Sequence, residues 1–265
     1  MNGTHISGKT SYTQSYLDDQ HTGQLARLRY LENAFDPLSK ATFEQLELPC
    51  KPIILDVGAG AGSFASWLTS RYSRATIIAT DIDTRFLNDI PNIQVLTHNV
   101  VTDDFPVASF DVVHIRALLC HLTERENVLT RITRWIRPGG WLVVEDVSLQ
   151  PSLKTTNPLF RKVACAGITL LEQSVGSDMF WADSLPYLLE TRGLSKIGSR
   201  TLDGKIGDNS PADNFWAATT AQATPLLLKL GLLTQSELNA MSALRADPEF
   251  TDTALTLISA WGQVS

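Results

Sequence analysis

The chain has 265 residues, of which 43% are hydrophobic, enough to bury the core of one α/β domain. Its formal net charge of −6 argues against nonspecific binding to nucleic acid or to an anionic membrane surface. No segment approaches the roughly 18 uninterrupted apolar residues of a membrane span, so we expect no membrane partner. The composition therefore favours small neutral or cationic partners.

The cysteines and the first residues bear on metals and on location. Cys50, Cys120 and Cys165 are odd in number and lack the spacing of metal ligands, which predicts no metal site. The polar start MNGTHISGKTSYTQSY lacks the apolar run of a secretory signal, so a reducing cytoplasm is the expected location. A homodimer is compatible with the sequence, which does not determine the oligomeric state.

Residues 50–147 alternate between short apolar runs and helical spacing, which predicts a parallel sheet wrapped by helices. Strands are expected at 51–57, 75–81, 92–99, 110–116 and 140–147, and two more at 194–202 and 253–262. Helices near 155–173 and 182–192 separate the fifth strand from the sixth. The expected fold class is therefore α/β, with a mostly parallel seven-stranded sheet and helices on both faces.

Further helices are expected on both flanks of this sheet. A helix over roughly 20–34 precedes Asp36-Pro37, a pair typical of an N-cap and the first position of a new helix. A helical insertion is expected at about 211–246, between strands six and seven. We therefore divide the chain into an N-terminal helical cap, residues 1–48, and an α/β domain, residues 49–265, whose insertion completes the cap.

Two expected helices carry the same start signal. Thr123 and Glu126 have capping-box spacing ahead of the fifth strand, and Thr234 and Glu237 repeat that spacing within the insertion. Each pair predicts a helix that begins at its threonine.

The stretch ILDVGAGAGSF joins the first strand, ending at Asp56, to a helix that begins near Ser63, through glycines at 58, 60 and 62. This arrangement places backbone N–H groups and a positive helix end beside a ligand. A dinucleotide fingerprint needs a third glycine where Ser63 stands, and Asp56 would repel a pyrophosphate. The loop therefore favours a ligand that carries an ammonium group, although a tight turn alone would also use glycine.

Asp81 ends the second strand, nineteen residues after Gly62. A carboxylate at this position can accept hydrogen bonds from both hydroxyls of a ribose. The alternative role is an N-cap of the following segment, for which Asp83 is better placed.

Four segments together resemble the class I S-adenosylmethionine-dependent methyltransferases over residues 50–147: DVGAGAG, TDID, FDVVHIRALLCHL and RPGGWLVVEDV. More loosely, YLDDQHTGQLARLRYLENAFDP and DNFWAATTAQ resemble segments of small-molecule methyltransferases of bacterial secondary metabolism. The resemblance implies a Rossmann-like fold and S-adenosyl-L-methionine as the cofactor. It also implies that the helical flanks form a cap over the active site.

The resemblance further implies a set of cofactor contacts. The loop residues Gly58, Ala59 and Gly60 would lie against the methionine part, Asp81 would bind the ribose and Ile82 would pack on the adenine. The backbone of Ile115 and Arg116, at the end of the fourth strand, would pass next to the sulfonium.

Two of the implied contacts depart from the family pattern or stay open. Asn99, flanked by Val100, stands where the family often has an acid that bonds the adenine amino group, and its amide oxygen can still accept that bond. Tyr16 and Arg27 match an aromatic and a basic position associated with the carboxylate of the cofactor. A packed aromatic ring and a solvated helix charge explain these two residues as well.

The acceptor side is less determined. Because the sulfonium methyl is already a strong electrophile, the protein must mainly align the acceptor and exclude water. His121 follows the fourth strand and is the candidate catalytic base or hydrogen-bond partner, unless it only packs on a helix start. Glu145 is expected either to steer a cationic acceptor or to cap a helix. The candidates for an apolar acceptor pocket, each also explained by core packing, are Tyr12, Trp181, Phe215 and Trp216.

The expected reaction is methyl transfer to oxygen or nitrogen, rather than carbon, of a small secondary metabolite. No Asn-Pro-Pro-Tyr or Asp-Pro-Pro-Tyr motif follows the fourth strand, which argues against a planar amide or base nitrogen. The main alternative is an enzyme that binds the same cofactor but catalyses a cyclisation or rearrangement. An NAD-dependent oxidoreductase is disfavoured by Asp56 and Ser63, and no appended domain supports a non-catalytic sensor.

Overall fold

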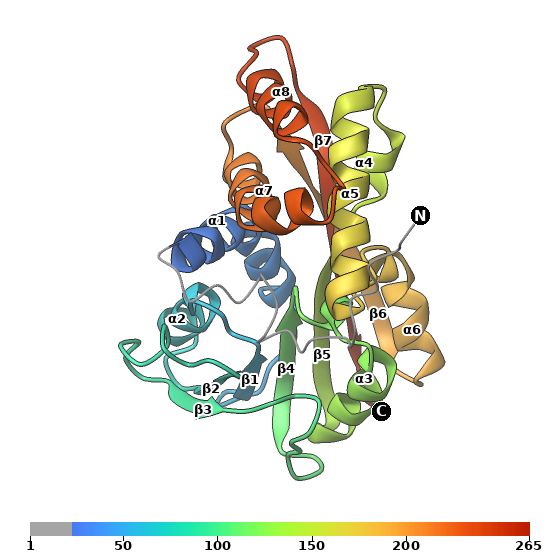
Figure 1. Cartoon of the computed structure of the whole chain (residues 1–265). Helices are drawn as coiled ribbons and strands as arrows, with labels where there is room; N and C mark the ends of the chain where they lie inside the picture. The colour runs from blue at the N-terminus through green and yellow to red at the C-terminus, as the bar shows by residue number, and fades with distance from the viewer. Residues whose placement is uncertain (1–22) are drawn as a thin grey trace.

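The computed structural model describes residues 23–265 and centres on a seven-stranded sheet in the order β3-β2-β1-β4-β5-β7-β6 (Figure 1). The strands are β1 Ile53–Val57, β2 Thr76–Asp81, β3 Gln94–Thr97, β4 Phe110–Arg116, β5 Ile136–Ser148, β6 Ser195–Ile206 and β7 Asp252–Gln263. Only β7 runs antiparallel to its neighbours in the sheet. The expected mostly parallel α/β sheet is therefore confirmed.

Helices cover both faces of this sheet. They are α1 Gly23–Phe43, α2 Ser63–Arg71, η2 Leu119–His121, α3 Arg125–Trp135, α4 Gln150–Lys154, α5 Pro158–Val175, η3 Trp181–Ser184, α6 Leu185–Thr191, α7 Pro211–Lys229 and α8 Gln235–Arg245. On one face Phe43 of α1 and Phe64 of α2 pack against Ile54 of β1. On the other face α3 and α6 pack against Leu55, the next residue of β1. Because successive strand residues point to opposite faces, a strand buried on both sides has apolar residues at consecutive positions, as Ile53, Ile54 and Leu55 show.

The insertion between β6 and β7 stands at the carboxyl edge of the sheet. The strand β6 runs in the same direction as β5, and β7 returns antiparallel, so α7 and α8 leave from that edge. Both helices pack with α5 around Phe160, Leu227 and Met241. Figure 1 shows α5, α7 and α8 around the upper part of β7, with α1 next to α7. Ligands of open α/β sheets gather at this edge.

The helix signal at Asp36-Pro37 was overridden by tertiary contacts. The helix α1 continues through Pro37, so the expected break at Asp36-Pro37 is wrong. The Asp36 carboxylate instead binds the Arg116 guanidinium at 2.9 Å and the Ser63 hydroxyl at 3.0 Å. These contacts compensate for the backbone hydrogen bond that proline cannot donate.

The two capping-box predictions had different outcomes. The box of Thr234 and Glu237 is present and opens α8. The box of Thr123 and Glu126 is absent, because α3 begins at Arg125 and Glu126 instead accepts a hydrogen bond from Trp181 Nε1 at 3.2 Å.

The structure also bears on metals and membranes. Among residues 23–265, no helix combines the length and the apolar character that a membrane crossing needs. In the same part of the chain, no three or more His, Cys, Asp or Glu side chains are grouped to hold a metal ion.

Candidate active site

A cavity of about 670 Å³ lies between the carboxyl ends of the strands and the helices α1, α5 and α7. Its volume is in the range of roughly 300–1,000 Å³ that is typical of small-molecule sites. We call the part lined by Gly58, Gly60, Asp81, Ile82 and Asn99 the sheet half. We call the part lined by Val163, Gly167, Leu171, Phe215 and Thr219 the helical half.

The glycine loop forms the floor of the sheet half. Gly58, Gly60 and Gly62 have φ angles of +70°, +59° and +80°, where a side chain is strained. An added Cβ would lie 2.8 Å from Leu118 at position 58 and 2.2 Å from Ile90 at position 62. Backbone conformation and packing therefore already require glycine here, and the bare loop backbone is left facing the cavity.

Asp81 lies beside this loop and accepts two backbone hydrogen bonds. Its Oδ2 accepts from the Gly60 N–H at 2.9 Å and its Oδ1 from the Asp83 N–H at 3.1 Å. Burial raises the pKa of Asp81, and the backbone hydrogen bonds counter this effect. No helix follows β2, so Asp81 is not an N-cap, and Asp83 forms a turn with the Arg85 N–H instead. The neighbouring Ile82 is 41% exposed and offers an apolar surface to the cavity.

The end of β3 supplies the next part of the lining. Asn99 lines the cavity, and its side-chain oxygen already accepts from the Val101 N–H at 3.0 Å, which leaves one lone pair. Val100 is buried beside it. His98, which no sequence pattern indicated, also lines the cavity and stacks on Phe105. Burial lowers the pKa of His98, so its ring is neutral near pH 7.

The end of β4 turns its backbone toward the cavity. Arg116 and Ala117 line the cavity, whereas Ile115 is fully buried and does not. The Arg116 side chain turns away from the cavity. Its guanidinium donates to the Ser39 hydroxyl at 2.8 Å and to the Asp36 carboxylate. Arg116 therefore faces a ligand mainly through its backbone.

Asp56 and Glu145 lie under the loop, outside the lining of the cavity. His114 stands between them, with Nδ1 2.7 Å from Asp56 Oδ1 and Nε2 3.3 Å from Glu145 Oε2. Burial alone would lower the pKa of His114, but the hydrogen bonds to both carboxylates outweigh it and raise that pKa. The second Asp56 oxygen, Oδ2, is buried without a partner in the described chain.

Glu145 is fully enclosed by this network. Its Oε1 accepts from the Ser259 hydroxyl at 2.7 Å, and Ser39 also donates to it. Burial alone would raise the pKa of Glu145. The hydrogen bond and charge of His114 outweigh this effect and give a lowered pKa, so the carboxylate stays ionised. The expected role of Glu145 in binding the acceptor is therefore corrected, because its side chain cannot reach the cavity.

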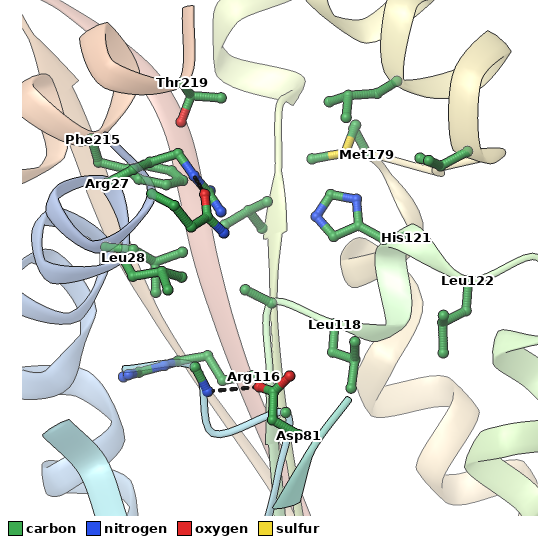
Figure 2. A pocket seen from close by; sticks show the side chains of 18 of the residues that line it. Arg27, Leu28, Asp81, Arg116, Leu118, His121, Leu122, Met179, Phe215 and Thr219 are labelled. Atoms are coloured by element: carbon green, nitrogen blue, oxygen red, sulfur yellow. Dashed lines mark hydrogen bonds between the residues drawn. The ribbon is translucent and has the colours of Figure 1, made fainter. Parts of the chain in front are cut away.

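His121 lies between the two halves. Figure 2 shows its ring facing the cavity near Leu118, Leu122 and Met179. Its Nδ1 is 2.9 Å from the Ser177 hydroxyl. Burial, and then the positive charges of nearby arginines, lower the pKa of His121 to about 3. The imidazole is neutral at physiological pH and suits hydrogen bonding better than proton uptake.

Aromatic side chains from the insertion line the helical half. Phe215 and Trp216 of α7 both line it, as expected. Trp181 does not, because it is 6% exposed and packs in the core beside α3, which corrects its expected role. The candidates Tyr12 and Tyr16 lie outside the described residues.

The helix α5 contributes a wall of the cavity that was not predicted from the sequence. Its lining residues are Val163, Ala164, Gly167, Ile168, Leu171 and Val175. They recur at helical spacing with small residues in the middle, a signal that helix packing produces equally well.

Arg27 of α1 also lines the cavity, although it is only 4% exposed. Its Nε donates to Gln24 Oε1 at 3.3 Å, and its guanidinium carbon lies 5.9 Å from the centre of the Phe215 ring.

Comparison with known proteins identifies the domain. Residues 55–144 match a family model described as a methyltransferase domain. The domain belongs to the class I S-adenosylmethionine-dependent methyltransferases. Methyltransferase str2 of Strobilurus tenacellus is 30% identical to the chain over 191 residues. That match covers 71% of this chain and 66% of str2, just under two thirds of the length of the relative.

Solved structures share the fold of this methyltransferase domain. A phosphoethanolamine N-methyltransferase 2 of Haemonchus contortus, bound to phosphomonomethylethanolamine and S-adenosylhomocysteine, matches with a TM-score of 0.61 at 14% identity. The match covers 97% of this chain and 61% of that one. The [4+2]-cyclase SpnF matches with a TM-score of 0.56 at 16% identity, over 87% of this chain and 81% of its own.

Proposed function

We propose that the chain transfers the methyl group of S-adenosylmethionine to oxygen or nitrogen of a small, secondary-metabolite acceptor. The observation that carries the proposal is the continuity of the cavity, which joins the glycine loop and Asp81 to an apolar helical half. A cofactor in the sheet half would direct its methyl group toward the helical half, where an acceptor has room.

The sheet half suits each part of the cofactor. The Asp81 carboxylate keeps acceptor capacity for the ribose hydroxyls, and Ile82 and Val100 offer apolar contacts to the adenine. The loop backbone from Gly58 to Gly60, with Ala59, would receive the methionine part, and Asp56 below it favours the ammonium group electrostatically.

The helical half would exclude water and align the acceptor. His121 stands at the junction of the two halves, where its neutral ring would hydrogen-bond the acceptor O–H or N–H. With a pKa of about 3 this histidine would position the acceptor rather than store its proton. The bond from the methyl carbon to the acceptor would form as the bond to the cofactor sulfur breaks, and the acceptor proton would be released to solvent.

We further propose that the N-terminal region, residues 1–48, and the insertion, residues 211–246, act as one cap. The described parts of both regions touch, because Gln222 Nε2 of α7 donates to Gln24 Oε1 of α1 at 3.3 Å. Phe35 of α1 also contacts Phe215 of α7 edge-on, with ring centroids 6.2 Å apart.

The experiment is incubation with methyl-labelled cofactor and an extract of the source organism, followed by mass spectrometry. A labelled small molecule that appears with the wild type, and not with Asp81→Ala, supports methyl transfer. A product of unchanged mass without label would instead indicate the cyclisation alternative, which the shared fold with a [4+2]-cyclase does not separate from methyl transfer.

A further inference from the structure

Among the residues that the structure describes, Arg27 is a buried cation without an acidic partner. Within residues 23–265, the contacts of its guanidinium are the hydrogen bond to Gln24 and the face of Phe215. Arginine keeps its proton inside proteins, and a buried charge without a counterion is costly. Such a group in the wall of a cavity is suited to an anionic part of a ligand.

The position of Arg27 along α1 indicates whether this anionic group belongs to the cofactor or to the acceptor. Leu28 covers the glycine loop, since its side chain lies 3.7 Å from where a Cβ on Gly60 would be. Farther down the helix, Glu32 accepts from the Ser63 N–H at 3.0 Å. Arg27 turns the other way, toward Gln24 one turn earlier and toward Phe215 of α7.

The surroundings in α7 complete a site for an anion. Figure 2 shows Arg27 beside Phe215 and near Thr219, across from His121, with Asp81 at the opposite end of the view. The Thr219 hydroxyl is buried and has no hydrogen-bond partner in the part of the chain that the structure describes. Gln222 Nε2 donates to the same Gln24 oxygen that accepts from Arg27 Nε. No group of residues 23–265 accepts a hydrogen bond from the two Nη groups of Arg27, so they can bind a ligand.

We infer that Arg27, with Thr219, binds an anionic group of the acceptor, a carboxylate or phenolate, and not the carboxylate of the cofactor. The inference rests on the proposed function and names its substrate class: an apolar acid whose hydrocarbon body packs on Gly167 and Leu171. Its reactive oxygen or nitrogen faces His121. This assignment differs from the expectation that the family resemblance raised for Arg27.

The test is calorimetry on the full chain saturated with S-adenosylhomocysteine. The probes are benzoate, 2-naphthoate and decanoate, each compared with its uncharged methyl ester. At least one acid is expected to bind on the order of ten- to a hundredfold more tightly than its ester, the usual strength of a hydrogen bond to a charged group. Arg27→Gln abolishes that preference and leaves the affinity for S-adenosylhomocysteine within about threefold.

Two further variants serve as controls. Arg71→Gln removes one positive charge from the exposed surface of α2, where Arg71 pairs with Glu44, and should keep the preference for the acid. Thr219→Val removes the buried hydroxyl at nearly constant volume and should weaken the acid alone. It tests the site independently if Arg27→Gln does not fold.

Three results would overturn the inference: no preference for any acid in the wild type, a preference that Arg27→Gln and Thr219→Val both retain, or loss of S-adenosylhomocysteine binding in Arg27→Gln with the acid preference intact. The last result would return Arg27 to the cofactor. Failure of the proposed function is distinct, because the wild type would then bind neither S-adenosylmethionine nor S-adenosylhomocysteine before any probe is added.

Discussion

The sheet half of the cavity is held by backbone groups, whereas the helical half is lined by side chains from three helices. Asp81 is fixed by two backbone N–H groups, and the glycine loop by its own conformation. In the helical half, polar atoms such as the Thr219 hydroxyl lack partners in the described chain. A site built from backbone suits a ligand that is constant in the family, while side chains can be exchanged to fit a particular acceptor.

The same contrast separates two buried basic side chains. His114 lies below the loop between two carboxylates, which makes it a structural element. Arg27 lies in the cavity wall, and no carboxylate of residues 23–265 pairs with it, although the chain as a whole carries a net charge of −6. Net charge therefore does not report the polarity of the acceptor site, which local charges determine.

The largest expected effect concerns the network below the loop. His114→Leu leaves Asp56 and Glu145 buried without their shared partner, and should lower the free energy of unfolding by about 3–5 kcal/mol. Urea denaturation followed by circular dichroism measures it. The matched control His98→Leu removes a buried histidine whose ring nitrogens have no hydrogen-bond partner among the described residues, and should cost much less. Similar losses in the two variants would contradict a structural role that is special to His114.

The next effect tests the backbone-built half. Asp81→Ala should weaken S-adenosylhomocysteine binding by roughly 1.5–3 kcal/mol, because the ribose loses its charged acceptor. Calorimetry provides the measurement, with Asp83→Ala as the control, since the Asp83 carboxylate is engaged by the backbone N–H and the guanidinium of Arg85. If both variants bind like the wild type, Asp81 holds the loop and not the ribose.

A smaller effect tests the side-chain-built half. Gly167 lies within α5 and lines the cavity, and an added Cβ would meet nothing within 4 Å. Gly167→Leu should therefore raise the free energy of unfolding by up to about 1 kcal/mol, the helix penalty of glycine. It should also weaken binding of 2-naphthoate while S-adenosylhomocysteine affinity stays unchanged, and Gly167→Ala should keep more of the probe affinity. Loss of cofactor affinity in Gly167→Leu would show that the two halves are not independent.

The smallest effect is an expected absence of titration at the junction of the halves. Since the pKa of His121 is lowered to about 3, its ring stays uncharged throughout pH 5–8. The pH profile of kcat/KM for an acceptor found by labelling should therefore show no ionisation near pH 6.5 that disappears in His121→Asn. An ionisation that does disappear in this variant would restore His121 as a general base.

Much of the fold was predictable because its signals are local. The strand β4 has the expected bounds, 110–116, since the β-branched residues Val112, Val113 and Ile115 cluster within a short segment, which indicates a buried strand. The capping box of Thr234 is likewise contained in four residues. Asp36-Pro37 failed as a local signal because Arg116, eighty residues away, binds the Asp36 carboxylate within one continuous helix.

The sequence by itself determined the sheet half of the candidate site, because the glycine loop and Asp81 follow a fixed order along two neighbouring strands. The tertiary structure alone decided which side chains reach the cavity. Glu145 ends near the same sheet edge as Arg116, yet it is enclosed below the loop by Ser39 and Ser259. The role proposed for Arg27 depends on the contact between α1 and α7. Whether a described residue supplies its counterion is decided by the packed neighbours, and the sequence of one helix does not contain that information.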